Sequence, residues 1–120
     1  MSQYRVKNDR EMADRKDRNL VNWNTMNNQA FIKALMSADT PDLMRLFLDD
    51  LLTKTEIETF VRKFQAAYLI ALGTPYTYII RQTGMSSKGI ARISRSMTNK
   101  RNGFHVIIKK MHPNGMHYSD

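Results

Sequence analysis

Apolar residues recur at helical spacing along most of the chain, and capping or turn residues separate the runs. The first run predicts a helix from about Thr25 to Ser37. A second helix is predicted to begin at Thr40, where a capping hydroxyl precedes a proline at the first helical position and an acid in the first turn. Its apolar stripe ends near Leu52. The apolar positions of these two helices are Phe31, Ile32, Leu35, Met36, Leu43, Leu46, Phe47, Leu51 and Leu52.

The third predicted helix is the longest. Thr53 and Glu56 have the spacing of a capping box, in which side chain and backbone of the two residues bond each other reciprocally. Apolar residues then continue at helical spacing for about twenty residues, up to Gly73, which suits the C-terminal end of a helix. We expect this helix to be the central element of the core.

Two shorter helices are predicted after it. The first covers 75–84 and ends at Gly84, and the second is a basic amphipathic helix from Ser86, its expected N-cap, to Met97. Their apolar residues have the spacing of a helix-turn-helix with a glycine at the bend. A plain helical hairpin with a solvated basic face is the alternative. The apolar positions concerned are Ile79, Ile80, Met85, Ile90 and Ile93.

The predicted fold is therefore all-α, a helical bundle with a C-terminal helix-turn-helix at 75–97. We expect a charged N-terminal arm over 1–19, a single helical domain over 20–110 and a flexible C-terminal tail over 111–120. Residues 98–103 predict a polar, basic turn. The short apolar segment 104–108 is expected to form a helical turn packed on a partner.

Composition favours an intracellular protein with no covalent or metal cross-links. The chain has 120 residues, which suffice for one small core, and no cysteine. No apolar run approaches the roughly 20 residues that a bilayer requires, and the N-terminus lacks the apolar core of a signal peptide. We expect a cytoplasmic protein without a membrane partner.

The charge is large and unevenly distributed. The formal net charge is +8 with a pI near 10.0, and ten of the eleven acidic residues lie at or before Glu58. The acid-free stretch from Thr59 to Ser119 would attract a polyanion and release counterions on contact. Nucleic acid suits this stretch better than an anionic membrane surface, because turns interrupt it and no single long apolar face is present.

Residues on and beside the basic helix are the candidates for contact with double-stranded DNA. Small polar residues at the start of a recognition helix can approach base edges, whereas Lys and Arg reach guanine edges or phosphates. We predict a DNA-binding surface of Ser86, Ser87, Lys88, Gly89, Arg92, Arg95, Lys100 and Arg101.

The sequence offers no catalytic constellation. No paired carboxylates lie in the basic half, no glycine-rich phosphate loop is present, and Ser86 and Ser87 have no activating base nearby. The three histidines are not spaced as metal ligands with acids or cysteines. We therefore predict that the protein is not an enzyme and that it binds neither a metal ion nor a cofactor.

The segment from Leu52 to Met97, LLTKTEIETFVRKFQAAYLIALG followed by PYTYIIRQTGMSSKGIARISRSM, resembles the Trp repressor family, particularly its shorter bacterial branch. The shared pattern is a Leu-Thr helix start, a long amphipathic helix ending in Gly, an Ile-x3-Thr-Gly turn and a helix with Ile-x-Arg-Ile-x-Arg. The resemblance implies an all-α, intertwined homodimer whose N-terminal helices interlock across subunits, with a helix-turn-helix reading an operator in each half.

The resemblance also implies a ligand pocket formed by Thr53, Lys63 and Arg92. In the tryptophan-responsive member, the indole lies between two arginines. Lys63 stands where the first arginine would be and lacks the flat guanidinium that stacks on an indole. Ile93 replaces a glycine and Gly89 replaces a threonine. We expect that tryptophan is not the ligand, which leaves an unidentified small-molecule effector open.

The predicted function is a sequence-specific, DNA-binding transcriptional regulator that acts as a homodimer, most simply a repressor that occludes its operator. Two alternatives use the same basic half. One is an architectural DNA- or RNA-binding accessory protein that does not read sequence. The other is a helical interaction module whose basic face meets an acidic protein.

Overall fold

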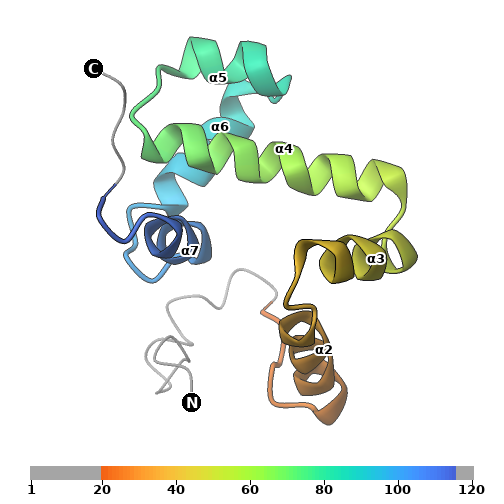
Figure 1. Cartoon of the computed structure of the whole chain (residues 1–120). Coiled ribbons are helices and arrows are strands. Elements are labelled where there is room, and N and C mark those ends of the chain that lie inside the picture. The colour runs from red at the N-terminus through yellow and green to blue at the C-terminus, as the bar shows by residue number, and fades with distance from the viewer. Residues whose placement is uncertain (1–19, 116–120) are drawn as a thin grey trace. The chain divides into compact units, whose positions relative to one another are not determined.

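The computed structural model describes residues 20–115, and every regular element within them is an α-helix (Figure 1). The all-α prediction is confirmed for these residues. The chain divides into two units between Leu51 and Leu52, and each unit has its own set of helices. The predicted arm at 1–19 and the end of the predicted tail, 116–120, lie outside the described residues. The helices are α2 Met26–Ser37, α3 Pro41–Leu51, α4 Lys54–Ala71, α5 Tyr76–Thr83, α6 Ser87–Ser96 and α7 Gly103–Met111.

The first unit contains α2 and α3, and both begin where the sequence predicts. The Thr25 hydroxyl accepts a hydrogen bond from the Asn28 amide at 3.1 Å, and the Thr40 hydroxyl accepts one from the Leu43 amide at 3.2 Å. Neither helix contains a buried residue. Large apolar side chains are instead exposed in this unit, namely Val21, Trp23, Met26, Phe31, Ile32, Met36, Leu43, Leu46 and Leu51.

The predicted capping box at the start of α4 is present. The Thr53 hydroxyl accepts a hydrogen bond from the Glu56 amide at 3.1 Å, and the Glu56 carboxylate accepts one from the Thr53 amide at 2.8 Å. The helix runs for 18 residues. Past its end, Gly73 has a φ of 79°, in the left-handed region that glycine adopts at low cost, and its amide bonds to the Ile70 carbonyl at 2.9 Å.

Two consecutive alanines near the end of α4 organise the core of the second unit. Ala66 and Ala67 are fully buried, and because successive residues of a helix point in different directions, they enter different clusters. Ala66 packs with Ile79 of α5 and Ile90 of α6. Ala67 belongs to a cluster with two further residues, Met97 and Ile108. In Figure 1, α5 and α7 lie on different sides of α4 and α6 crosses between them, so that α4 is the central helix as predicted.

The helix α7 corrects the prediction for 104–108. It has nine residues rather than a single turn, because Asn102 caps it by accepting a hydrogen bond from the His105 amide at 3.0 Å. Just past its end, His112 is 2.8 Å from the Tyr68 hydroxyl and so connects the start of the predicted tail to α4. Among the described residues, no helix is both long and apolar enough to cross a membrane.

Candidate nucleic-acid interface

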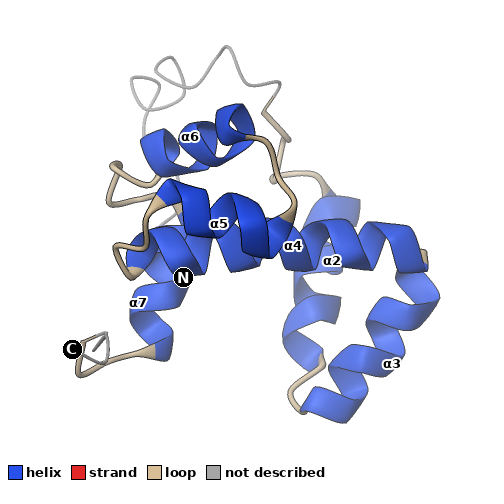
Figure 2. Cartoon of the chain, turned by 90° about the horizontal axis from the view of Figure 1, so that it is seen from above, coloured by secondary structure: helices blue, strands red, loops and turns tan. Residues whose placement is uncertain are grey.

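The helices α5 and α6 form the helix-turn-helix that the sequence predicts. Figure 2 shows them side by side, joined by residues 84–86. Gly84 has a φ of 71°, which a residue with a Cβ adopts only at a cost, and its amide donates to the Ile80 carbonyl at 2.8 Å. The left-handed residue ends α5 and redirects the chain into α6.

Thr83 fixes this turn from the inside, a role that the apolar spacing of the two helices does not predict. Its side chain is buried, with 5% of the residue exposed. The hydroxyl donates to the Ile79 carbonyl at 2.7 Å and accepts from the Met85 amide at 3.1 Å. One side chain therefore bonds to backbone groups on both sides of the bend. The Thr-Gly pair in the sequence is the signal for this turn.

The helix α6 begins at Ser86, whose hydroxyl accepts a hydrogen bond from the Gly89 amide at 3.1 Å, as the prediction of an N-cap requires. One face of α6 is packed, since Ile90 is fully buried. The other face carries Lys88, Arg92 and Arg95, which follow one another at intervals of one helical turn and are exposed. The helix α6 therefore presents its basic side chains on the face opposite Ile90.

Gly89 lies beside the stripe and is half-buried. A Cβ atom at this position would lie 3.4 Å from the Ser86 hydroxyl and 3.5 Å from the end of the Met85 side chain, which is contact distance without a clash. The fold of the chain therefore does not require a glycine here.

The turn after α6 is ordered by its own side chains. The Asn99 carboxamide oxygen accepts from the Arg101 amide at 2.9 Å, and the Asn102 side chain bonds to the Ser96 hydroxyl at 3.2 Å. These bonds hold the segment that carries the exposed Lys100 and Arg101 next to the end of α6. The predicted DNA-binding residues thus come from α6, its capping residue and the turn that follows it.

No carboxylate neutralises the stripe within residues 20–115. The ion pairs there join Arg45 to Asp42 at 2.9 Å and Lys54 to Glu58 at 2.7 Å, so neither involves α6. The hydrogen bond from Lys54 holds the pKa of Glu58 below its usual value, and the same bond raises the pKa of Lys54. The positive charges of α6 are therefore available to an anionic partner.

The three residues of the predicted ligand pocket do not line either of the two cavities described for the second unit. Thr53 is at the start of α4 with its hydroxyl engaged as the N-cap, while Lys63 and Arg92 are exposed on α4 and α6. The pocket of Thr53, Lys63 and Arg92 remains a prediction. The described residues also contain no group of three or more His, Asp or Glu residues placed to hold a metal ion.

Two short helices joined by a turn that contains a glycine, the second with an exposed basic face, are the architecture of helix-turn-helix DNA-binding proteins. The comparison with protein families agrees, because the family described as Trp repressor protein matches residues 26–112. The chain belongs to the Trp repressor family, a family of DNA-binding transcriptional regulators and not of enzymes. No curated protein and no solved structure matches the chain.

Proposed function

We propose that the protein is a sequence-specific transcriptional repressor that binds double-stranded DNA as a homodimer. The observation that carries the proposal is the exposed stripe of Lys88, Arg92 and Arg95 on a recognition helix whose start and entry turn are fixed by hydrogen bonds. Such a helix can enter the major groove with its N-terminal residues toward the base edges. Ser86, Ser87 and Gly89 occupy that end.

Phosphate contacts would come from the neighbouring turn. Lys100 and Arg101 follow the C-terminal end of α6, and the side-chain bonds of Asn99 and Asn102 order the backbone around them. Contacts of this kind position a protein on DNA but carry no sequence information directly. The proposal therefore assigns base reading to α6 and anchoring to the turn.

The homodimer is supported by the apolar surface of α2 and α3. Both helices lack buried residues, yet they expose side chains as large as Phe31 and Leu46. Large apolar surfaces exposed to water commonly mark protein–protein interfaces. A second copy would bury these residues and place two recognition helices on successive half-sites of a two-fold symmetric operator. Occlusion of that operator would produce repression.

Tryptophan is not the corepressor in this proposal. Lys63 provides a point charge where stacking on an indole needs a planar group, and the Thr53 hydroxyl already bonds to the Glu56 amide. Calorimetric titration with tryptophan is expected to give no saturable heat. Saturable binding that Arg92→Ala abolishes would contradict this part of the proposal.

The test is selection of bound fragments from a sheared genomic library at near-physiological salt, with the wild type and Arg92→Ala in parallel. We expect a short, two-fold symmetric site. Arg92→Ala should lose about 1–3 kcal/mol on that site and relax specificity at one position if Arg92 contacts a base. Lys100→Ala should instead weaken binding to all sequences about equally.

Three outcomes would contradict the proposal in different ways, one from this selection, one from binding assays with DNA and RNA at low salt, and one from the selected site taken together with sedimentation of the protein. Recovery of fragments without a common sequence, by wild type and variant alike, would favour the architectural or RNA-binding alternative. Absence of binding to any nucleic acid at low salt would favour a protein partner for the basic face. Recovery of an asymmetric site by a protein that sediments as a monomer would exclude the homodimer.

A further inference from the structure

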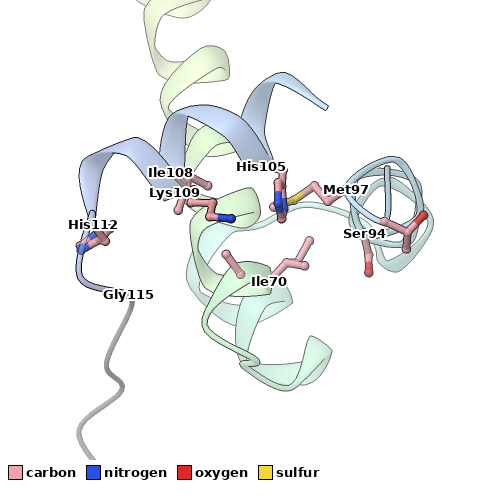
Figure 3. A pocket seen from close by; sticks show the side chains of 10 residues that line it. Ile70, Ser94, Met97, His105, Ile108, Lys109, His112 and Gly115 are labelled. Carbon is pink, nitrogen blue, oxygen red and sulfur yellow. The ribbon is translucent and has the colours of Figure 1, made fainter. Parts of the chain in front are cut away.

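A cavity of about 500 Å³ lies in the second unit, and none of the residues of the predicted ligand pocket lines it. Its walls come from the C-terminal turns of α4 and α6 and from α7 (Figure 3). Cavities of roughly 300–1,000 Å³ are the usual size for small-molecule sites. The cavity is therefore large enough for a metabolite rather than only for solvent.

The lining divides into an apolar and a polar part. Ile70, Met97 and Ile108 supply the apolar part, and Met97 and Ile108 belong to the core cluster around Ala67. The polar part includes two histidines and a lysine, His105, Lys109 and His112. In Figure 3 the Lys109 ammonium group and the His105 ring point into the same space beside Met97.

The polar part can donate hydrogen bonds but has no negative charge. No Asp or Glu lines the cavity, and none occurs anywhere from Thr59 to Ser119. Lysine is a donor only, and a histidine ring offers at least one N–H donor whether neutral or protonated. The His112 ring is held in place by the Tyr68 hydroxyl at 2.8 Å. An anionic group is the complement of such a wall.

We propose that this cavity binds a small organic acid whose apolar body lies on Ile70, Met97 and Ile108 and whose carboxylate meets Lys109 and His105. The apolar wall selects against a bare inorganic anion, and the donors select against a neutral molecule of the same shape. The bound acid would contact the end of the recognition helix through Met97 and Ser94. This binding site does not depend on the proposed DNA-binding function.

The experiment is a titration of the isotope-labelled full-length chain, without DNA, followed by ¹H–¹⁵N chemical shifts. Three probes distinguish the contribution of the negative charge from that of the apolar body. The first, 3-phenylpropionate, has both features, 3-phenylpropan-1-ol lacks the charge, and inorganic phosphate lacks the apolar body. We expect saturable shifts confined to residues that line the cavity with 3-phenylpropionate. The alcohol and phosphate should each bind roughly tenfold more weakly, as expected from the loss of one charge-assisted bond or of the apolar contact.

Two neighbouring lysines of α7 provide a matched pair of variants. Lys109 lines the cavity, whereas Lys110 does not, and both are exposed, so replacement should leave the fold intact. Lys109→Gln should weaken 3-phenylpropionate roughly tenfold, and Lys110→Gln should leave its affinity unchanged. Equal effects of the two variants would reveal only a diffuse positive field and overturn the proposal. Equal binding of acid and alcohol, tighter binding of phosphate, or no saturable shift would also overturn it.

Discussion

The α2–α3 unit and the α4–α7 unit consist of similar helices, but they bury their apolar residues to very different extents. In the α4–α7 unit, Ile79 and Ile90 are fully buried around Ala66, and a second cluster forms around Ala67. In the α2–α3 unit no helical residue is buried, and Leu46 is 64% exposed. Periodicity alone does not distinguish the two cases, since both units have helical apolar stripes. The difference shows that the α4–α7 unit has its own core, whereas the described helices of the α2–α3 unit leave their apolar faces exposed.

The two units also differ in charge. Within residues 20–51, Lys33 and Arg45 are outnumbered by Asp39, Asp42, Asp49 and Asp50. Within residues 52–115, eleven Lys and Arg residues stand against only Glu56 and Glu58. An acidic surface repels DNA and a basic surface attracts it. The contrast supports a division in which α4–α7 bind DNA and α2–α3 associate with a second copy.

Replacing one buried and one exposed apolar residue tests this division with the largest expected effect. Ile90→Ala removes a fully buried side chain and should lower the free energy of unfolding by about 2–5 kcal/mol. Leu46→Ala removes an exposed one and should have little effect on the unfolding of the α4–α7 unit, but it should raise the dissociation constant of the dimer. Urea denaturation and analytical ultracentrifugation measure the two quantities.

The two variants control for each other. Ile90→Ala should leave the dissociation constant of the dimer close to that of the wild type under conditions where the protein is folded. If Leu46→Ala changes neither stability nor the dimer constant, α3 is not an interface between copies, and the apolar surface of the α2–α3 unit requires another explanation.

The local elements were predictable from the sequence because their determinants are local. Thr40, Thr53 and Ser86 each accept the hydrogen bond at the helix start that the sequence assigned to them, and Gly84 lies at the predicted bend. The length of α7 was not predicted. Asn102 is a preferred capping residue, but it lies within the segment 98–103, which was assigned as a whole to a polar turn. The missed signal was therefore present in the sequence.

Contacts between distant residues were not predictable in this way. The bond between Tyr68 and His112 spans 44 residues, and the cavity beside α7 depends on three helices meeting there. The burial of Ala66 and Ala67 could be expected from their position in the longest helix, but the division into two clusters could not. The predicted pocket of Thr53, Lys63 and Arg92 came from a resemblance rather than from any physical pattern, and no described cavity includes it.

The helix caps give a second comparison between the units, with a smaller expected effect. Thr53 takes part in a reciprocal capping box at the start of the central helix, whereas Thr25 accepts a single hydrogen bond. Thr53→Ala should lower the free energy of unfolding by about 1–2 kcal/mol. Thr25→Ala should lower it by only about 0.5 kcal/mol, the lower end of the range for loss of an N-cap. Urea denaturation of both variants measures the difference. Equal losses would mean that the capping box adds nothing to a single bond.

Replacing Gly89 should change the stability of the α4–α7 unit and its affinity for DNA in opposite directions. Gly89→Ala should stabilise the fold by about 0.5–1 kcal/mol, because a helical glycine is entropically unfavourable and the Cβ atom meets no clash. The same change should weaken DNA binding if the bare backbone beside Lys88 and Arg92 approaches the DNA closely. Thermal unfolding and binding to the selected operator measure the two effects. Ser94→Ala is the control, since Ser94 lies on α6 away from the stripe, and unchanged binding by both variants would remove Gly89 from the interface.

Removing one of the exposed ion pairs should have the smallest effect on stability, and this effect should depend most strongly on pH. Because Lys54 lowers the pKa of Glu58 in the folded chain, the pair contributes stability above the ordinary carboxyl pKa of 4.5, and this contribution is lost as the pH falls through the lowered pKa. Glu58→Gln should therefore lower the Tm slightly at neutral pH and not at all in strong acid. Asp42→Asn should have less effect at neutral pH, because the Asp42 side chain is 94% exposed against 49% for Glu58. A Tm difference between Glu58→Gln and the wild type that persists unchanged into acid would show that the lost contribution is not electrostatic.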